Sequence, residues 1–366
     1  MNDAFSVAVV GAGAAGIAAA ITAARGGCRT LLLDAKPAAG GTGGFSGLTT
    51  LCGLFDHAGN FLNDGFAREF AEALMLEDGV TMPVTMSGLL VQPYRPASFL
   101  KVAARLLAGE PLLTVRWQTP LSRVEVAQNR IQTINQMPVK AVIDCSGTAE
   151  AGRLAGERRL ATDATTQAPA VMIPLRNVQC DLKSPLVVAK IRTAVARAAL
   201  PPVTFMPGCD PGISPVKFAG SPAQVPALLE VFRRDIPGLA GCAPEPGDLA
   251  SASRAGVMIM GRYMLTGEDV LGARTFPDAM ARNNWPVEQW TADGRQTLQH
   301  LSAGRHYDIP ARVLQAERTQ NLFMAGKSLS ADVRAAASAR VMGCCLATGA
   351  AAGKLAAEFA ASSPNP

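Results

Sequence analysis

The hydrophobic pattern at the start of the chain predicts two buried strands with a helix between them. Residues 6–10 form an apolar run typical of a strand, and an alanine- and isoleucine-rich segment at helical spacing follows the glycine-rich residues 11–16. A second apolar run, residues 30–33, ends at Asp34. This order is the layout of a dinucleotide-binding βαβ unit: a strand, a glycine turn, a helix, a second strand and an acidic residue.

Each part of this unit has a chemical purpose. Gly11 permits the tight turn, Gly13 lets the backbone approach a pyrophosphate, and Gly16 lets the helix pack closely on the strand. The helix N-terminus offers free N–H groups and a partial positive charge to the phosphates. Asp34 accepts hydrogen bonds from ribose hydroxyls. The sequence therefore predicts a bound dinucleotide.

Further along the chain, shorter patterns predict alternating helices and strands. Helical patterns cover residues 65–77 and 96–107, and short strands are predicted at residues 112–117, 121–126, 130–135 and 140–145. The second and third of these strands form a hairpin that turns at Gln128 and Asn129. Residues 39–53 contain so much glycine, serine and threonine that we expect no regular element there.

The pattern changes at about residue 158 and changes back at about residue 306. In the middle segment proline is frequent, and the pattern predicts a strand at 170–175 and helices at 225–234 and 276–284. In the last segment it predicts a strand at 322–325 and a helix of small residues at 341–361. We therefore expect an α/β fold. A Rossmann-like three-layer domain with a central parallel sheet, residues 1–157 and 306–366, would carry an inserted mixed α/β cap (substrate) domain, residues 158–305.

Composition narrows the class of protein. The 366 residues are 49% hydrophobic and 17% charged, with a net charge of +5. Lysine and arginine are scattered, without a long basic run or interleaved aromatic residues, so nucleic-acid binding has little support. Residues 4–24 are uncharged and long enough to span a membrane, but their glycine spacing fits a cofactor turn and no Lys or Arg precedes them. We therefore expect a cytoplasmic protein without a transmembrane segment.

The eight cysteines are dispersed, and none forms a CxxC pair of the kind that binds zinc. We therefore expect reduced, mostly buried thiols and no metal site. Cys344 and Cys345 are adjacent. They are either a redox-active pair or two small residues packed at a helix start; a disulfide between neighbours would close a strained ring.

Several segments in the second half of the chain carry a family resemblance. They are residues 142–147 (VIDCSG), 261–270, 276–279, 307–310 (YDIP), 321–327 (NLFMAGK), 339–345 (ARVMGCC) and 347–353 (ATGAAAG). With the opening glycine turn, they make the chain resemble the glutathione-reductase-type flavoproteins, which have two dinucleotide-binding domains, and more closely the broad FAD-dependent oxidoreductase family. The resemblance runs in order along nearly the whole chain.

The resemblance implies FAD, rather than NAD, as the resident dinucleotide. The residues that match the family's FAD contacts are Gly11, Gly13, Ala14, Ala15 and Gly16 in the pyrophosphate turn, Asp34 and Ala35 at the ribose, Lys36, Gly40, Gly41, Thr42 and Gly44 beside the ribityl chain and flavin, Leu121 at the adenine, Ser146 and Gly147 in the late-strand turn, Gly326 and Lys327 at the second phosphate contact, and Met342, Gly343, Cys344 and Cys345 beside the flavin ring.

Two positions depart from the family pattern. Asp34 stands where the family more often has Glu, so its shorter side chain must reach the ribose by another rotamer or through water. Lys327 stands where Arg is common, which keeps the positive charge but loses the bidentate fork. The helix that starts after Val341 would aim its N-terminus at the flavin, where it would stabilise the negative charge of the reduced ring by roughly 0.3–2 kcal/mol.

Four residues are candidates for catalysis. Arg340 lies in the Arg-Val-Met turn and could bind an anionic substrate group or a flavin carbonyl. His57 and His306 are two of only three histidines, and either could serve as an acid or base or be a surface residue. Cys52 could attach the flavin covalently, act as a thiol catalyst or simply fill apolar space. No CxxxxC partner lies near it, which disfavours a disulfide-reductase mechanism.

The sequence contains no second GxGxxG turn after a strand, so a dedicated NAD(P)H domain is not expected. Electrons would then enter from a substrate and leave to oxygen, a quinone or a protein. The leading hypothesis is an enzyme that oxidises a small organic substrate by hydride transfer to FAD. The alternatives are a flavin monooxygenase or a maturase acting on a partner protein's side chain, or an electron-transfer subunit without a substrate pocket. A homo-oligomer is left open.

Overall fold

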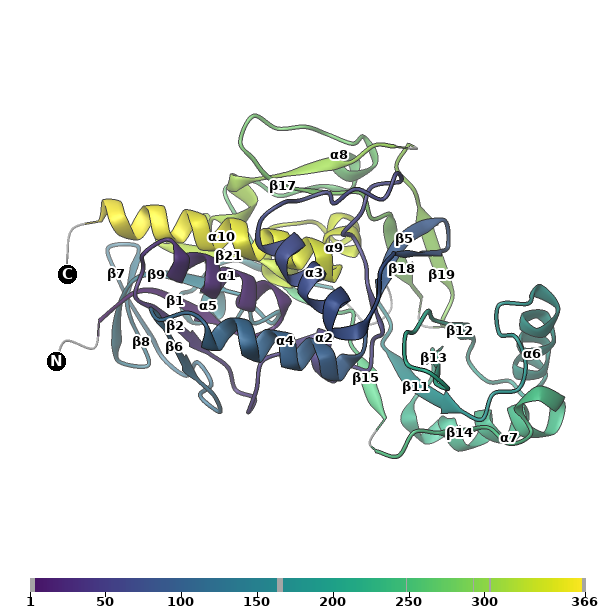
Figure 1. The fold of residues 1–366 in the computed structure, drawn as a ribbon. Helices are drawn as coiled ribbons and strands as arrows, with labels where there is room; N and C mark the ends of the chain where they lie inside the picture. The colour runs from purple at the N-terminus through teal and green to yellow at the C-terminus, as the bar shows by residue number, and fades with distance from the viewer. Residues whose placement is uncertain (1–3, 163–166, 248, 292, 303, 364–366) are drawn as a thin grey trace.

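The computed structural model describes residues 4–162, 167–247, 249–291, 293–302 and 304–363, and within them a seven-stranded sheet forms the centre of the molecule (Figure 1). Its parallel part has the order β6 (Leu113–Arg116), β2 (Thr30–Leu33), β1 (Phe5–Val10), β9 (Met137–Asp144) and β21 (Leu322–Met324). Strands β7 (Val124–Ala127) and β8 (Arg130–Ile134) form an antiparallel hairpin that joins the start of β9. The parallel sheet is as predicted.

Side chains alternate between the two faces of β1, as strand geometry requires. Val7 and Val9 join the larger apolar cluster with the helices, whereas Ala8 and Val10 join a smaller cluster on the other face. In Figure 1, the helices α1 (Ala14–Arg25), α3 (Phe66–Asp78), α4 (Pro96–Ala108) and α10 (Met342–Ser362) lie on one side of the sheet. The short helix α5 (Glu150–Leu154) packs on β9 in the second layer.

Helices α1 and α10 pack so closely that only glycine fits at their contact. A Cβ atom at Gly349 would overlap the carbonyl oxygen of Ala15, and one at Gly353 would lie 2.5 Å from the carbonyl oxygen of Ala19. This contact explains why the C-terminal helix consists mainly of small residues. It also ties the end of the chain to the first βαβ unit, because α1 starts at the glycine turn.

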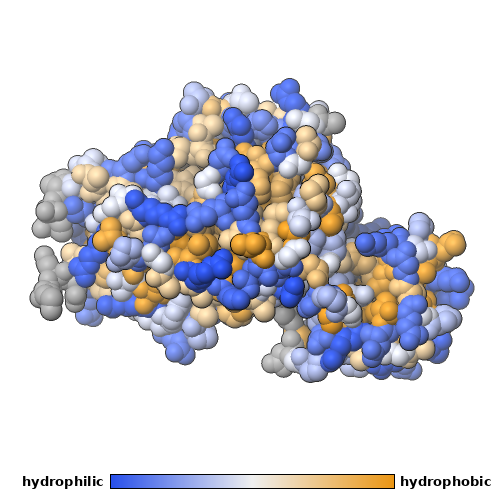
Figure 2. All heavy atoms as spheres, viewed as in Figure 1, coloured by the Kyte–Doolittle hydropathy of each residue, from blue (hydrophilic) through white to orange (hydrophobic). Residues whose placement is uncertain are grey.

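A second lobe lies at the right of Figure 1, and Figure 2 shows it as a separate bulk joined by a narrower neck. It contains an antiparallel sheet of β11 (Ala170–Arg176), β12 (Val203–Phe205), β13 (Ser214–Phe218), β14 (Ala243–Pro244) and β15 (Ala250–Ala252), with helices α6 (Pro185–Arg197) and α7 (Val225–Asp235). An apolar cluster between Val171 and Cys242 is the lobe's own core. This lobe is the structural unit that meets the central domain across the site.

The segment that follows returns to the central domain. Its elements are β16 (Val257–Ile259), which pairs with β10 (Arg159–Ala161), α8 (Gly267–Leu271), β17 (Ala279–Asn283), β18 (Val287–Trp290), β19 (Gln296–Gln299), β20 (Tyr307–Pro310) and α9 (Val333–Ala339). Trp285 and Val287 belong to the same apolar cluster as α1 and α10. Short 3₁₀ helices lie at Pro222–Gln224, Pro237–Leu239, Ala311–Leu314 and Gly326–Ser328.

Three sequence predictions of local structure are wrong. The predicted helix at residues 276–284 is the strand β17, which pairs with β20. Strand β7 begins at Val124, three residues after the predicted start. The glycine-rich stretch 39–53 does contain regular elements, α2 (Gly41–Phe45) and β3 (Thr50–Leu51), the latter pairing with β5 (Leu89–Pro93), which also pairs with β4 (Val84–Met86). In each case pairing or packing with a distant segment decides the structure.

No single helix in the described ranges is long and apolar enough to cross a membrane. Helices α9 and α10 reach that length only as a pair, across a bend of 97°. Most residues of α10 are buried, many of them against α1.

Candidate active site

A cavity of about 590 Å³ opens at the carboxyl ends of the parallel strands. Its lining includes Val10 at the end of β1, Leu33 at the end of β2 and Cys145 after β9. In open α/β sheets this edge is where ligands bind. Residues of the second lobe, such as Met206 and Lys217, line the other end of the same cavity. The site is therefore built from both lobes and has two ends.

The glycine turn forms the first end. Gly11 has a φ of 95°, and a Cβ there would lie 2.7 Å from the carbonyl oxygen of Cys145. Gly13 differs, because its φ of −77° suits any residue and a Cβ would meet only the Cα of Gly41, at 3.9 Å. Glycine at position 13 therefore keeps space free inside the cavity that a side chain would otherwise fill. This is the cradle that a pyrophosphate needs.

Helix α1 begins at this cradle with its N–H groups available. Within the described residues, no side chain caps the helix at Gly13 and its first turn holds no acidic residue. The first N–H groups of a helix have no partner within the helix and attract anions. Ala14 and Ala15 in this first turn also line the cavity. Space, donors and partial positive charge thus all fit the diphosphate of a dinucleotide.

Asp34 lies beside the turn and is held by backbone donors. One carboxylate oxygen accepts a hydrogen bond from the Ala12 N–H at 2.6 Å, and the other accepts one from the Lys36 N–H at 2.8 Å. Each oxygen keeps a second lone pair for a ribose hydroxyl. Ala35, Lys36 and Leu121 line the cavity at the same end. The structure brings these residues together as the sequence predicts.

The centre of the cavity lies between the late-strand turn and the C-terminal segment. Ser146, Gly147, Gly326 and Lys327 all line it. The ammonium of Lys327 donates to the carbonyl oxygen of Ala255 at 3.3 Å, and burial lowers its pKa. Gly41, Thr42, Met342 and Cys345 also line the cavity.

Five predicted cofactor contacts lie behind the lining rather than in it: Gly16, Gly40, Gly44, Gly343 and Cys344. The glycines let other parts of the chain come close. A Cβ at Gly16 would overlap the Gly11 carbonyl oxygen, and one at Gly343 would lie 2.5 Å from the carbonyl oxygen of Gly53. Gly40 and Gly44 lie against Leu100 of α4 in the same way, and Cys344 is fully buried. These residues shape the site without facing it.

The four catalytic candidates divide into two pairs. Arg340 and Cys52 line the cavity, whereas His57 is exposed and His306 lies beside Asp308, with 4.0 Å between Nε2 and Oδ1. Neither histidine belongs to the cavity lining, so we do not retain them as catalytic candidates. Burial, together with the charge of Glu288, raises the pKa of Cys52 to about 12. That thiol therefore stays protonated at neutral pH, which argues against a thiolate catalyst.

The adjacent cysteines are both reduced. Burial raises the pKa of Cys344 well above its ordinary value and that of Cys345 to about 11. The Cys345 thiol donates to the carbonyl oxygen of Arg340 at 3.3 Å. This environment suits two packed thiols and not a reactive thiolate pair.

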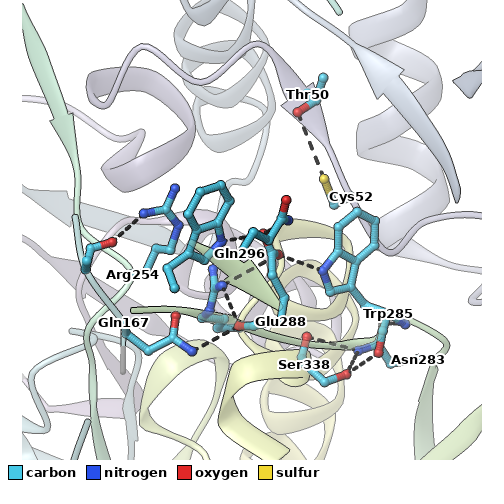
Figure 3. Close-up of polar contacts among 12 residues, drawn as sticks. Thr50, Cys52, Gln167, Arg254, Asn283, Trp285, Glu288, Gln296 and Ser338 are labelled. Carbon is cyan, nitrogen blue, oxygen red and sulfur yellow. Dashed lines mark hydrogen bonds and ion pairs between the residues drawn. The ribbon is translucent and has the colours of Figure 1, made fainter. Parts of the chain in front are cut away.

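The second end of the cavity is charged, and Glu288 is at its centre (Figure 3). Its carboxylate accepts hydrogen bonds from the indole N–H groups of Trp285 at 3.0 Å and Trp290 at 2.7 Å, and from the Gln296 amide at 2.9 Å. Burial favours a higher pKa for Glu288. Arg340, Lys217 and the two indole donors outweigh that effect and lower the pKa to about 2. Glu288 is therefore an ionised acceptor whose oxygens already take three hydrogen bonds.

Three cations lie near this carboxylate, of which Lys217 and Arg254 are buried and Arg340 is partly buried. Arg340 Nη2 lies 3.6 Å from Glu288 Oε2, while Lys217 Nζ and the Arg254 guanidinium lie 4.0 and 4.2 Å from the centre of the Trp290 indole. Burial lowers the pKa of Lys217 to about 8, and burial with the nearby Arg340 charge lowers that of Arg254 to about 10. Cations over an indole face are attracted by its quadrupole. The end as a whole carries excess positive charge.

At this charged end, the sequence patterns predict Arg340 but not Lys217, Arg254, Glu288 or the two tryptophans. One signal was available: Lys217 is a single charge inside the apolar run Val216–Phe218, and Glu288 stands between Val287 and Trp290 in another strand. A lone charge on a buried strand must find a partner, so it marks a site more often than an exposed charge does.

Comparisons with known proteins agree with the fold and the glycine end. The flavin-dependent brominase Bmp2 superposes with a TM-score of 0.55 at 12% identity, covering 98% of this chain and 80% of the other. A geranylgeranyl bacteriochlorophyll reductase-like protein from Thermoplasma acidophilum gives 0.50 at 14% identity, covering 97% and 78%. At such identities the likeness shows the fold alone. A search of curated proteins finds no match to the sequence.

The sequence itself matches a family model described as FAD dependent oxidoreductase, over residues 6–211 and 216–365. These ranges include the glycine turn, Asp34, the second lobe and the C-terminal helix. The finer resemblance to glutathione-reductase-type proteins stays a prediction. The free space at Gly13, the open N-terminus of α1 and the carboxylate of Asp34 fit the cofactor that the family uses. The chain belongs to the FAD-dependent oxidoreductase family, and it is an enzyme with FAD as its cofactor.

Proposed function

We propose that this enzyme oxidises a small organic substrate by hydride transfer to the flavin. The observation that carries the proposal is the single cavity with two unlike ends, one fitted to a dinucleotide and the other lined by charged and aromatic side chains. The volume of about 590 Å³ lies in the range of small-molecule and cofactor sites. A subunit that only passes electrons to a partner would not need the second, polar end.

The protein's own residues would bind, orient and enclose the reactants. Gly13 and the first turn of α1 would hold the diphosphate, and Asp34 the ribose. Arg340 would orient groups at the charged end, and Trp285 would help to exclude water from it. FAD, when bound, supplies the acceptor for a hydride from the substrate, which also releases a proton. Oxygen, a quinone or a protein would take up the two electrons afterwards.

We also propose that the second lobe, which lies within the predicted cap segment of residues 158–305, acts as the cap over the substrate. Lys217 on β13 and Arg254 after β15 both reach the cavity from this segment. The cap would thus decide which substrates enter.

The absence of a second dinucleotide domain in the described chain supports a direct oxidation. Among the residues that the structure describes, parallel pairing of named strands occurs only in the central sheet, and the sheet of the second lobe is antiparallel throughout. A dinucleotide-binding domain for NAD(P)H would need a parallel βαβ unit of its own. Electrons would therefore come from the organic substrate itself.

Anaerobic bleaching of the flavin tests the proposal. The purified holoenzyme is mixed without oxygen with a panel of small alcohols, amines and organic acids, and the visible flavin absorbance is followed. We expect at least one compound to bleach it without NADH or NADPH. Bleaching by a pyridine nucleotide alone, with oxygen-dependent hydroxylation of an added compound, would overturn the proposal in favour of a monooxygenase. Bleaching by no organic compound would leave it without support.

A further inference from the structure

The ammonium of Lys217 is buried and faces the cavity without a hydrogen-bonding partner. Lys217 is 8% exposed and lies in the cavity wall. Among the described residues, no hydrogen bond or ion pair reaches its ammonium; its close neighbour is the indole of Trp290. Burying a charge without a partner is costly, so such a group is rare unless a ligand completes it.

Two arginines beside it also have unused donors. A guanidinium has five N–H donors. The Nε atom of Arg340 is buried and has no hydrogen-bond partner in the described part of the chain. Within the described ranges, Arg254 makes one hydrogen bond, from Nη1 to the carbonyl oxygen of Ala168 (Figure 3). Donors from three cations therefore remain at this end of the cavity.

The charges at this end do not balance. Among the described residues, Glu288 is the one carboxylate that forms an ion pair with any of the three cations, through Arg340. Its oxygens already accept hydrogen bonds from Trp285, Trp290 and Gln296. Cys52, the other titratable group near Lys217, carries no charge at neutral pH. At least one negative charge is missing from the site.

The FAD phosphates do not supply this charge, because their cradle lies at the other end of the cavity, at Gly13 and α1. Lys217 and Arg254 belong to the second lobe, which holds none of the residues matched to FAD contacts. We propose that Lys217, with Arg254 and Arg340, forms a carboxylate-binding subsite, and that the substrate is a small organic acid. This inference rests on the proposed function, since it names the substrate class of the same site.

Apolar side chains complete the subsite. Trp285, Leu48 and Met206 line the same cavity. The acid therefore carries an apolar body, aliphatic or aromatic. Its carboxylate faces Lys217, and its oxidisable carbon faces the flavin. Charge pairing in a buried site of this kind discriminates strongly, because a neutral analogue leaves the cations unpaired.

Matched pairs of acids and amides test the subsite by binding alone. Isothermal titration calorimetry of the holoenzyme would compare acetate with acetamide, benzoate with benzamide, and phenylacetate with phenylacetamide. We expect at least one acid to bind tenfold or more tightly than its amide. Lys217→Met should remove that preference, whereas Lys190→Met, at an exposed lysine of α6 in the same lobe, should keep it. Arg254→Met should also remove the preference for the acid, which provides a second, independent test.

The outcomes separate this inference from the proposed function. No preference for any acid, or a preference that survives both Lys217→Met and Arg254→Met in variants with normal flavin spectra, overturns the subsite. A lost preference in those variants supports it even when no compound bleaches the flavin, in which case only the proposed oxidation fails. Bleaching by neutral compounds without a preference for acids would leave the oxidation standing and overturn the subsite.

Discussion

The two ends of the cavity are built in opposite ways. The FAD end uses backbone: Gly13 leaves space, α1 presents N–H groups, and Asp34 is itself fixed by the backbone of Ala12 and Lys36. The other end uses long charged side chains, such as Lys217 and Arg340, around Glu288. Backbone can be shaped by a short local sequence, whereas a cluster of side chains must be assembled from distant segments. The proposed cofactor end thus rests on a local motif, and the proposed substrate end on a long-range one.

The largest effect is expected where a glycine supports the fold itself. Gly16→Ala would place a Cβ into the carbonyl oxygen of Gly11, so backbone must move. We expect a loss of about 3 kcal/mol or more in the free energy of unfolding, because overpacking against backbone cannot relax. Urea unfolding of the apo-protein measures it. A stability equal to that of the unchanged protein would contradict the close packing of turn and helix.

Gly13→Ala is the same substitution as Gly16→Ala, made where a Cβ would have free space around it. Here the φ of −77° accepts alanine and the new Cβ meets only the Gly41 Cα at 3.9 Å, so the fold should be kept. We expect the apo-protein to unfold within about 2 °C of its normal temperature, since surface-like substitutions change little. Binding of FAD should weaken tenfold or more, because the methyl group occupies the cradle. Equal FAD affinity would place the diphosphate elsewhere.

The charged end should show a dependence on pH. Burial lowers the pKa of Lys217 to about 8, so its ammonium is present below that pH and lost above it. The kcat/KM for an acid substrate, which reports groups of the free enzyme, should therefore fall as the pH rises through about 8. In Lys217→Arg the cation persists and the fall should move to higher pH. A profile identical in both proteins would show that Lys217 does not meet the substrate charge.

The smallest effect is expected at the two histidines. His57 is exposed and His306 lies outside the cavity lining. We expect His57→Gln and His306→Gln to keep kcat/KM within about twofold, since isolated surface changes are nearly neutral. Steady-state kinetics with the substrate found by bleaching would check this. A loss of a hundredfold or more in either variant would return that histidine to catalysis.

The sequence predicted the FAD end well because its determinants are contiguous. The strand, glycine turn, helix, strand and Asp34 fall within the first 34 residues, and the parallel sheet follows from that unit. It predicted less where distant segments meet. Residues 279–283 form a strand because they pair with residues 307–310, and α2 forms because Gly43 and Gly44 pack on Phe99 and Leu100 of α4.

The charged end is the extreme case of such distant contacts. Lys217, Arg254, Glu288 and Arg340 come from four separate parts of the chain. No spacing rule links them, so a single sequence identifies at most one member at a time. The sequence does show a single charge within an apolar run. Only a structure can then assign that charged residue to a site.

The direct test of the two-ended cavity is the FAD dissociation constant of two variant apo-proteins measured side by side, by quenching of flavin fluorescence. Gly13→Ala should weaken FAD binding tenfold or more, whereas Lys217→Met should leave it within about threefold, because the lysine serves the substrate. If Lys217→Met weakens FAD binding as much as Gly13→Ala does, the buried cations belong to the cofactor and the division of the cavity into two ends is wrong.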